Sequence, residues 1–201
     1  MKKYFKFNQK FNSSKYWEKR YKSGGNSGDG SNGILAKFKI SIINEFINKN
    51  NIVSVIELGC GDSNILANCN YRNYYGFDVS KTIIALNKEK YRHDPLKNFF
   101  HIKKIKNFTA ELSLSIDVIY HLIEDNIFEK HLKSLFNSSN KFVIIYSSNF
   151  DKFYSKKSHV LHRKFDSYIE ENFKSFKLSE VINNPFPELS TANFYIYEKI
   201  E

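Results

Sequence analysis

Short apolar runs alternate with helical patterns along most of this 201-residue chain. Runs rich in β-branched and aromatic residues predict seven strands, at Val53–Leu58, Tyr74–Asp78, Asn98–Ile102, Glu111–Ile116, Phe142–Tyr146, Phe176–Val181 and Phe194–Lys199. Apolar residues at helical spacing predict helices at Ser14–Tyr21, Leu35–Lys49, Asn64–Asn70, Lys81–Lys90, Asp125–Phe136 and Arg163–Phe173. Alternating strands and helices are typical of an α/β protein with a parallel sheet.

The last two predicted strands are separated by the turn-rich segment Asn183–Pro187 and no helical pattern. We therefore expect a Rossmann-like, doubly wound seven-stranded sheet that ends in an antiparallel hairpin, with helices on both faces. No repeat or linker divides the chain, so residues 1–201 should form one domain. Within it, residues 1–50 would be a helical cap and residues 51–201 the core.

Residues 23–33 of the cap are dominated by glycine, serine and asparagine. Such a loop is either a flexible connector or a lid whose backbone amides face a ligand. Its length and its place between two predicted helices favour the lid. Asn26 and Ser27 are then candidate substrate contacts.

The first predicted core strand carries Glu57 and runs into Gly59-Cys60-Gly61. Glycines let backbone approach a ligand closely, although an ordinary strand-to-helix turn would explain them as well. Asp78 ends the second strand 21 positions after Glu57, where a carboxylate can accept hydrogen bonds from a ribose diol. Together these features favour a nucleotide-cofactor site. Asn64 stands where a dinucleotide fingerprint has its third glycine, which weakens a pyrophosphate interpretation.

The order Glu57-x-Gly59-x-Gly61, with Asp78, resembles motif I and the second-strand end of class I S-adenosylmethionine (SAM)-dependent methyltransferases of the small stand-alone bacterial type. The segment Leu112–Asp125, which contains Asp117 and a His-Leu turn, resembles their motif IV. Tyr16-Trp17-Glu18-Lys19-Arg20-Tyr21 resembles the aromatic cap that closes over the cofactor. The resemblance covers about residues 14–199.

This resemblance implies SAM as the cofactor and S-adenosylhomocysteine (SAH) as the product. The cofactor contacts that it implies are Tyr16, Trp17, Tyr21, Glu57, Gly59, Cys60, Gly61, Asp78, Val79 and Asp117. The three aromatic residues could instead be core, Asp117 could be a helix N-cap, and Glu57 could organise the loop through backbone hydrogen bonds. Lys103–Lys106 replaces the acidic residue that often binds the adenine amine, which leaves Asn107 and Phe108 as candidates.

Methyl transfer requires alignment and, for an oxygen acceptor, a base within hydrogen-bond reach. His121, His159 and His162 follow the fourth and fifth strands on the ligand side, and they are the candidate catalytic bases. A lone histidine is more often a capping or packing residue, and catalysis by alignment alone stays open. His93, His101 and His131 look peripheral.

The segment His159–Phe165 places a guanidinium beside two imidazoles, which suits a phosphate or carboxylate, although a solvated helix start has the same composition. Arg163 and Tyr146 are therefore candidate substrate contacts. We expect O-methylation of a small, hydroxyl-bearing and anionic acceptor, either a metabolite or a precursor in bacterial polysaccharide biosynthesis. An RNA or protein methyltransferase and a non-catalytic SAM-binding module are the alternatives.

The formal charge of +10 suits an anionic partner, but no arginine-rich tract accompanies it, so nucleic acid is not favoured. Cys60 and Cys69 are the only cysteines, and the sequence has no Cys/His array at zinc spacing, so we predict no metal. No signal-type apolar segment and no 18-residue apolar run is found in the sequence. We therefore expect a cytoplasmic protein without a membrane span.

Overall fold

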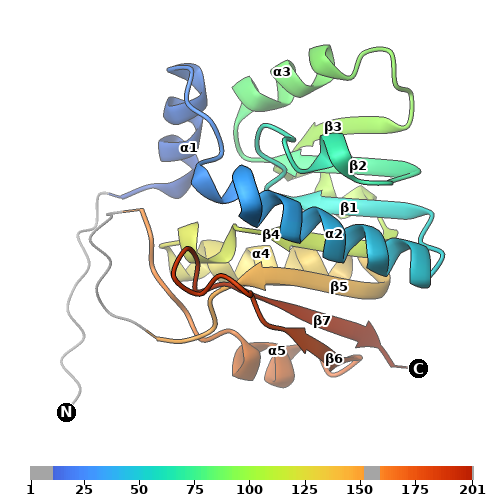
Figure 1. Cartoon of the computed structure of the whole chain (residues 1–201). Coiled ribbons are helices and arrows are strands. Elements are labelled where there is room, and N and C mark those ends of the chain that lie inside the picture. Colours follow the sequence, from blue (N-terminus) through green and yellow to red (C-terminus); the bar gives the residue numbers. More distant parts are fainter. Residues whose placement is uncertain (1–10, 152–158, 201) are drawn as a thin grey trace.

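Seven strands form one sheet in the order β3-β2-β1-β4-β5-β7-β6 in the computed structural model, which describes residues 11–151 and 159–200 (Figure 1). The strands are β1 Ser54–Leu58, β2 Asn73–Asp78, β3 Lys97–His101, β4 Ala110–Ile116, β5 Ser139–Ser147, β6 Phe176–Ile182 and β7 Asn193–Lys199. Neighbours pair in parallel except β7, which is antiparallel to both β5 and β6. The predicted Rossmann-like sheet with a terminal hairpin is confirmed.

Helices cover both faces of the sheet (Figure 1). They are α1 Ser13–Lys22, α2 Gly33–Lys49, α3 Lys81–Lys90, α4 Asp125–Asn137 and α5 Asp166–Asn172. Val55 and its neighbour Ile56 point to opposite faces, so β1 is buried on both sides. One face packs against α2 and α3, and the other packs against α4 and α5. None of the helices in the described residues is long and apolar enough to cross a membrane.

The predicted helix Asn64–Asn70 is wrong. The chain makes only a short 3-10 helix there, η2 Leu66–Asn68. Ser63 takes a left-handed φ of 57°, and the Asn64 side-chain amide donates to the Ser31 carbonyl at 2.5 Å and to the Asn32 side chain at 3.0 Å. These contacts tie the segment to the glycine-rich loop, so it does not coil into an α-helix.

The last predicted helix is shorter than expected, because α5 begins at Asp166 and not at Arg163. The Asn149 side-chain oxygen accepts from the Phe165 amide at 2.8 Å and the Asp166 amide at 3.4 Å, which satisfies donors at the helix start. Arg163 precedes this point and extends toward α4.

Candidate active site

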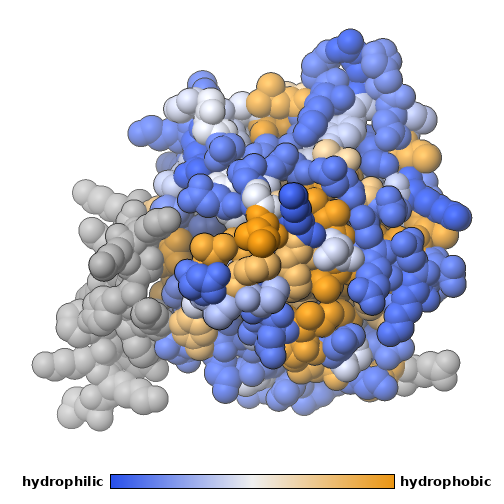
Figure 2. All heavy atoms as spheres, viewed as in Figure 1, coloured by the Kyte–Doolittle hydropathy of each residue, from blue (hydrophilic) through white to orange (hydrophobic). Residues whose placement is uncertain are grey.

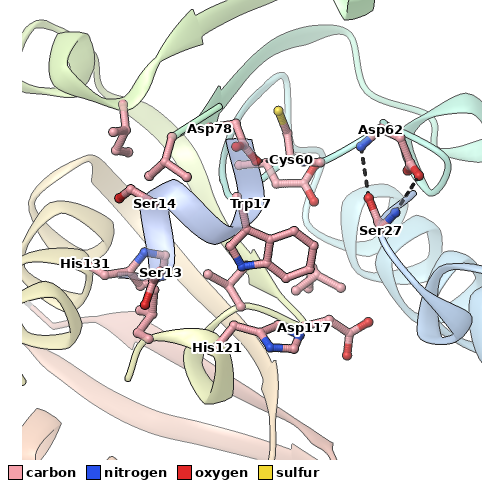
Figure 3. A pocket seen from close by; sticks show the side chains of 18 of the residues that line it. Ser13, Ser14, Trp17, Ser27, Cys60, Asp62, Asp78, Asp117, His121 and His131 are labelled. Carbon is pink, nitrogen blue, oxygen red and sulfur yellow. Dashed lines mark hydrogen bonds between the residues drawn. The ribbon is translucent and has the colours of Figure 1, made fainter. Parts of the chain in front are cut away.

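A cavity of about 430 Å³ lies at the carboxyl ends of β1, β2 and β4, beneath α1 and the glycine-rich loop (Figure 3). In open parallel sheets, ligands bind beyond this edge. Of the predicted cofactor contacts, the residues that line the cavity are Trp17, Tyr21, Glu57, Gly59, Cys60, Gly61, Asp78, Val79 and Asp117. Tyr16 is not among the lining residues; its ring stacks on His159 at 4.7 Å between centroids.

The glycine loop needs glycine at both of its predicted positions. Gly59 and Gly61 have φ values of 86° and 50°, a region that residues with a Cβ rarely adopt. A Cβ at Gly59 would lie 2.5 Å from a Val118 methyl, and one at Gly61 would collide with the Ser27 hydroxyl oxygen. The loop therefore makes room for neighbouring residues as well as for a ligand.

The end of β2 fixes this loop. The amides of Gly59 and Cys60 donate to the Phe77 carbonyl at 2.7 and 3.1 Å, and the Gly61 amide donates to the Asp78 carboxylate at 3.1 Å. The second Asp78 oxygen accepts from the Ser80 amide at 2.8 Å. Burial raises the pKa of Asp78 to about 6, and these two amides oppose that shift. Asp78 thus organises the loop as well as facing the cavity.

Glu57 forms part of the cavity wall, but it does not organise the loop through backbone hydrogen bonds, as the sequence suggested. Its carboxylate accepts from the Tyr74 hydroxyl at 2.6 Å, and the loop amides are bonded elsewhere. Burial raises the pKa of Glu57 to about 7, against smaller lowering effects of the Tyr74 hydrogen bond and the Lys39 charge.

Asp117 directly follows β4 with a left-handed φ of 60° and makes an ion pair with Lys39 of α2. Lys39 is fully buried, and its ammonium also donates to the Gly30 carbonyl at 2.6 Å. The Tyr120 hydroxyl donates to the other Asp117 oxygen at 2.7 Å. Asp117 is not a helix N-cap, because Glu124 takes that place in α4. Sequence reasoning missed Lys39, which lies 78 positions from its partner.

The glycine-rich loop is closed onto the cofactor loop through Ser27. The Ser27 amide donates to the Asp62 carboxylate at 2.9 Å, and the Asp62 amide donates to the Ser27 hydroxyl at 3.0 Å (Figure 3). Tyr21 of α1 shares a 3.1 Å hydrogen bond with the same hydroxyl. Asn26 is exposed, and its carbonyl accepts from Arg20 at 2.6 Å. The geometry supports a lid in which Ser27 lines the cavity and Asn26 does not.

Two carboxylates hold α1 across the mouth of the cavity. Glu18 accepts from the hydroxyls of Ser80 and Thr82 at 2.6 and 2.8 Å, and these bonds lower its pKa. At the N-terminus of the helix, Glu124 accepts from the Ser13 amide at 2.9 Å and from its hydroxyl. The helix therefore bridges the N-termini of α3 and α4.

His121 is the one predicted base that lines the cavity. Its Nδ1 lies 2.9 Å from the His159 carbonyl oxygen, which can only accept, so Nδ1 carries a proton. Burial lowers the pKa of His121 to about 4, which leaves the ring neutral with an Nε2 lone pair. The His159 ring stacks on Tyr16 and His121, and His162 bonds the Ser148 hydroxyl at 2.7 Å; neither lines the cavity.

The structure does not bring the two remaining substrate candidates, Arg163 and Tyr146, to the cavity. Arg163 pairs with Asp125 at 2.7 Å, donates to the carbonyls of Leu122 and Ile123 at 3.2 and 2.6 Å, and lies over the Phe128 ring. Tyr146 is buried against Phe38 and Phe194, on the sheet face that packs against α2. Neither residue lines the cavity.

His131 of α4 lines the cavity, although the sequence suggested that it would be peripheral. Its Nε2 lies 2.8 Å from the Ser115 hydroxyl. Neither of the adenine candidates from the sequence is among the lining residues: Phe108 packs against Phe77 and Phe100, and Asn107 is exposed. In the described part of the chain, no three His, Cys, Asp or Glu side chains gather as metal ligands.

No family model and no curated protein matches this sequence. Solved structures do match the fold. Magnesium protoporphyrin IX methyltransferase from Synechocystis PCC 6803 with bound SAH aligns at a TM-score of 0.66 and 12% identity, over 92% of this chain and 97% of that chain. An SAM-dependent methyltransferase from Clostridium acetobutylicum ATCC 824 aligns at 0.62 and 15%, over 94% and 98%. The N-methyltransferase NodS from Bradyrhizobium japonicum WM9 aligns at 0.66 and 10%, over 85% and 99%.

The chain has the fold of class I SAM-dependent methyltransferases. Its cavity lies where that fold, like other open parallel sheets, binds ligands.

Proposed function

We propose that this protein is a SAM-dependent methyltransferase. The observation that carries the proposal is the glycine loop held against Asp78 at the wall of a lidded cavity, on this fold. The cavity suits the cofactor chemically, because it combines apolar walls with a carboxylate at the end of β2 for a ribose diol. Bound SAM would supply a methyl group already activated on a sulfonium, so no protein nucleophile is required.

The residues of this chain would divide the binding between them. Gly59 and Gly61 would run along the methionine part, and Asp78 would accept from the ribose hydroxyls. Asp117 lies at the lid end of the site, where its carboxylate matches the ammonium of an amino acid, and the buried Lys39 behind it holds that carboxylate in place. Trp17 and Tyr21 of α1 would cover the ligand and exclude water.

We propose oxygen as the methylated atom, because His121 is neutral and holds an Nε2 lone pair at the cavity. A hydroxyl loses its proton as it is methylated, and a base within hydrogen-bond reach assists that loss. A small, hydroxyl-bearing acceptor therefore stays our proposal, as a metabolite or surface-glycan precursor. An anionic acceptor is not part of this proposal, because Arg163, the side chain expected to bind the anion, pairs with Asp125 and bonds the Ile123 carbonyl instead.

The first test is calorimetry with SAM, SAH and NAD, in which we expect binding of the first two only. SAH release is then measured with fractionated cell metabolites and, in parallel, with total RNA. Turnover with RNA alone would favour an RNA methyltransferase, and SAM binding without turnover in any fraction would favour a non-catalytic module.

His121→Gln tests the base once an acceptor is known. We expect kcat to fall by ~10²–10⁴-fold with SAM affinity nearly unchanged, because only proton removal is lost. His93→Gln is the matched control, since His93 is exposed and is not among the cavity-lining residues. An unchanged kcat in His121→Gln would show that alignment alone suffices.

A further inference from the structure

The cavity continues past Asp78 into a lobe between η3, the 3-10 helix Ile102–Asn107, and α4. Ile102, Ile105 and Ile127 give this lobe apolar walls. In Figure 3, His131 lies on the opposite side of the cavity from Ser27 and Asp62, with Trp17 between them. If the glycine loop holds the methionine part and Asp78 the ribose, the flat apolar purine belongs in this lobe.

Adenine has one amine that donates and ring nitrogens that accept. The polar side chains that η3 and α4 contribute to the lobe are Lys103, Lys130, His131 and Ser134, and Ser13 and Ser14 of α1 lie on the same side of the cavity (Figure 3). A lysine ammonium can only donate, so both lysines suit ring nitrogens and neither can receive the amine. The acceptor must therefore be a neutral imidazole, a serine hydroxyl or the backbone.

His131 meets this requirement. Its Nε2 is bonded to the Ser115 hydroxyl, which is itself fully buried on β4 and holds the ring in place. No residue in the described part of the chain hydrogen-bonds to its Nδ1. Burial lowers the pKa of His131 to about 4, so the ring is neutral and one nitrogen keeps its lone pair.

We propose that His131 Nδ1 accepts the hydrogen bond of the adenine amine, in the role that an acidic residue after β3 would otherwise fill. This inference rests on the proposed function, because it assumes that SAM is the ligand. It makes His131 a specificity-determining residue that favours adenine over purines without the amine.

The test measures, by calorimetry, whether removing the His131 side chain and removing the adenine amine of the ligand have the same effect on binding. SAH and its 6-deamino analogue, which differs only by the amine, are titrated into the wild type, His131→Phe and Ser134→Ala. We expect the wild type to bind the analogue roughly 10-fold more weakly than SAH, as for loss of one buried hydrogen bond. His131→Phe should bind both ligands equally, at about the affinity of the wild type for the analogue.

Ser134→Ala is the matched control, because Ser134 lines the same lobe one helical turn away. It should keep the wild-type preference for SAH. A preference that persists in His131→Phe, or that disappears in Ser134→Ala, would overturn the assignment. Wild-type protein that binds neither ligand would overturn the proposed function itself, and this inference with it.

His131→Phe leaves the Ser115 hydroxyl without a partner, so the double variant His131→Phe/Ser115→Ala is titrated as well. A measurement on the wild type avoids substitution altogether. The ¹⁵N resonance of His131 Nδ1 should move when SAH is added and should move less with the deamino analogue. Equal shifts with both ligands would contradict a bond to the amine.

Discussion

Single carboxylates in this site serve two purposes at once. Asp78 binds the Gly61 and Ser80 amides, so the residue that faces the ligand also shapes the glycine loop. Sequence spacing was enough to find Asp78 and the glycines, because their geometry is set within one strand–loop–strand unit. Lys39 and His131 could not be found in this way, because Lys39 lies 78 positions before its partner Asp117 and His131 is held by Ser115 of another element, β4.

Asp78→Asn should weaken SAH binding by about 2–3 kcal/mol, because a charge-assisted pair of hydrogen bonds to the ribose is lost. Calorimetry measures the loss, and thermal unfolding of the unliganded variant checks that the loop survives. Asp94→Asn is the control, since Asp94 lies on the surface between α3 and β3. Equal SAH affinity in Asp78→Asn and wild type would contradict the ribose assignment.

Glu57 makes stability depend on pH. Its pKa is raised from about 4.5 to about 7 in the fold, so its stabilising contribution is complete below pH 4.5 and is lost as the pH rises through 7. Glu57→Gln removes the titration. The variant should therefore gain on the wild type between pH 5 and 8, by up to about 3 kcal/mol at roughly 1.4 kcal/mol per pKa unit.

Urea unfolding of both proteins across this pH range measures the difference. Glu111→Gln is a control of opposite sign, because hydrogen bonding to Lys141 lowers the pKa of Glu111. That variant should be less stable than the wild type at neutral pH, and the difference should vanish on acidification. Parallel curves for Glu57→Gln and wild type would show that Glu57 does not titrate in this range.

Most elements were predictable because their apolar periodicity coincides with burial. β1 carries apolar residues on both faces, β4 places Leu112, Leu114 and Ile116 on one face, and α4 presents Phe128, Leu132 and Leu135 on one side. The predicted helix after β1 does not form, because Asn64 bonds to the glycine-rich loop. That contact joins residues 33 positions apart, so the local sequence pattern does not reveal it. Arg163 likewise satisfies helical propensity but bonds to α4.

Closure of the lid should require glycine at position 61, because a side chain there would occupy the space of Ser27 and Tyr21. In Gly61→Ala, the new methyl collides with the Ser27 hydroxyl oxygen and lies 2.9 Å from the Tyr21 hydroxyl, so the loop cannot close. Gly33→Ala carries the same backbone strain, with φ +60° against +50°, but meets nothing within 4 Å. Strain alone is worth on the order of 1–3 kcal/mol in either variant.

Hydrogen exchange of residues 14–33 and of the Asp62 amide distinguishes the two variants. Gly61→Ala should lose protection at the Ser27 and Asp62 amides and should bind SAH at least tenfold more weakly, by the loss of about one hydrogen-bonded contact or more. Gly33→Ala should keep the wild-type protection of these amides and the wild-type affinity for SAH. Saturating SAH with acceptor should raise protection of this segment in the wild type, and no change would reduce the loop to a connector.

On the scale of the whole molecule, the Lys39–Asp117 pair joins the cap to the core. It links α2 and the lid to the end of β4, with Lys39 fully buried. Figure 2 shows polar residues over much of one face of the protein. Among the lysines of the described residues, Lys39 alone is fully buried. Removing one member of such a pair is costly, because it leaves the charge of the other member buried without a partner.

Lys39→Met should destabilise the protein by about 3–5 kcal/mol, because it leaves the Asp117 carboxylate partly buried without its cation. Lys39→Met/Asp117→Asn should recover part of this loss. Lys37→Met, on the exposed side of α2, is the control and should stay within about 0.5 kcal/mol of the wild type. Urea unfolding checks all three, and equal stability of Lys39→Met and Lys37→Met would show that the pair contributes nothing.

The short turn after β1 has an electrostatic consequence. An α-helix starting there would point its positive end at the ligand and favour an anion by about 0.3–1 kcal/mol. Here η2 is only three residues long, and the carboxylates of Asp62 and Asp78 line the cavity beside the loop. This part of the wall therefore favours a cation over a phosphate. In the proposed reaction sulfur loses its positive charge with the methyl group, so the same carboxylates hold the spent ligand less tightly than the fresh one.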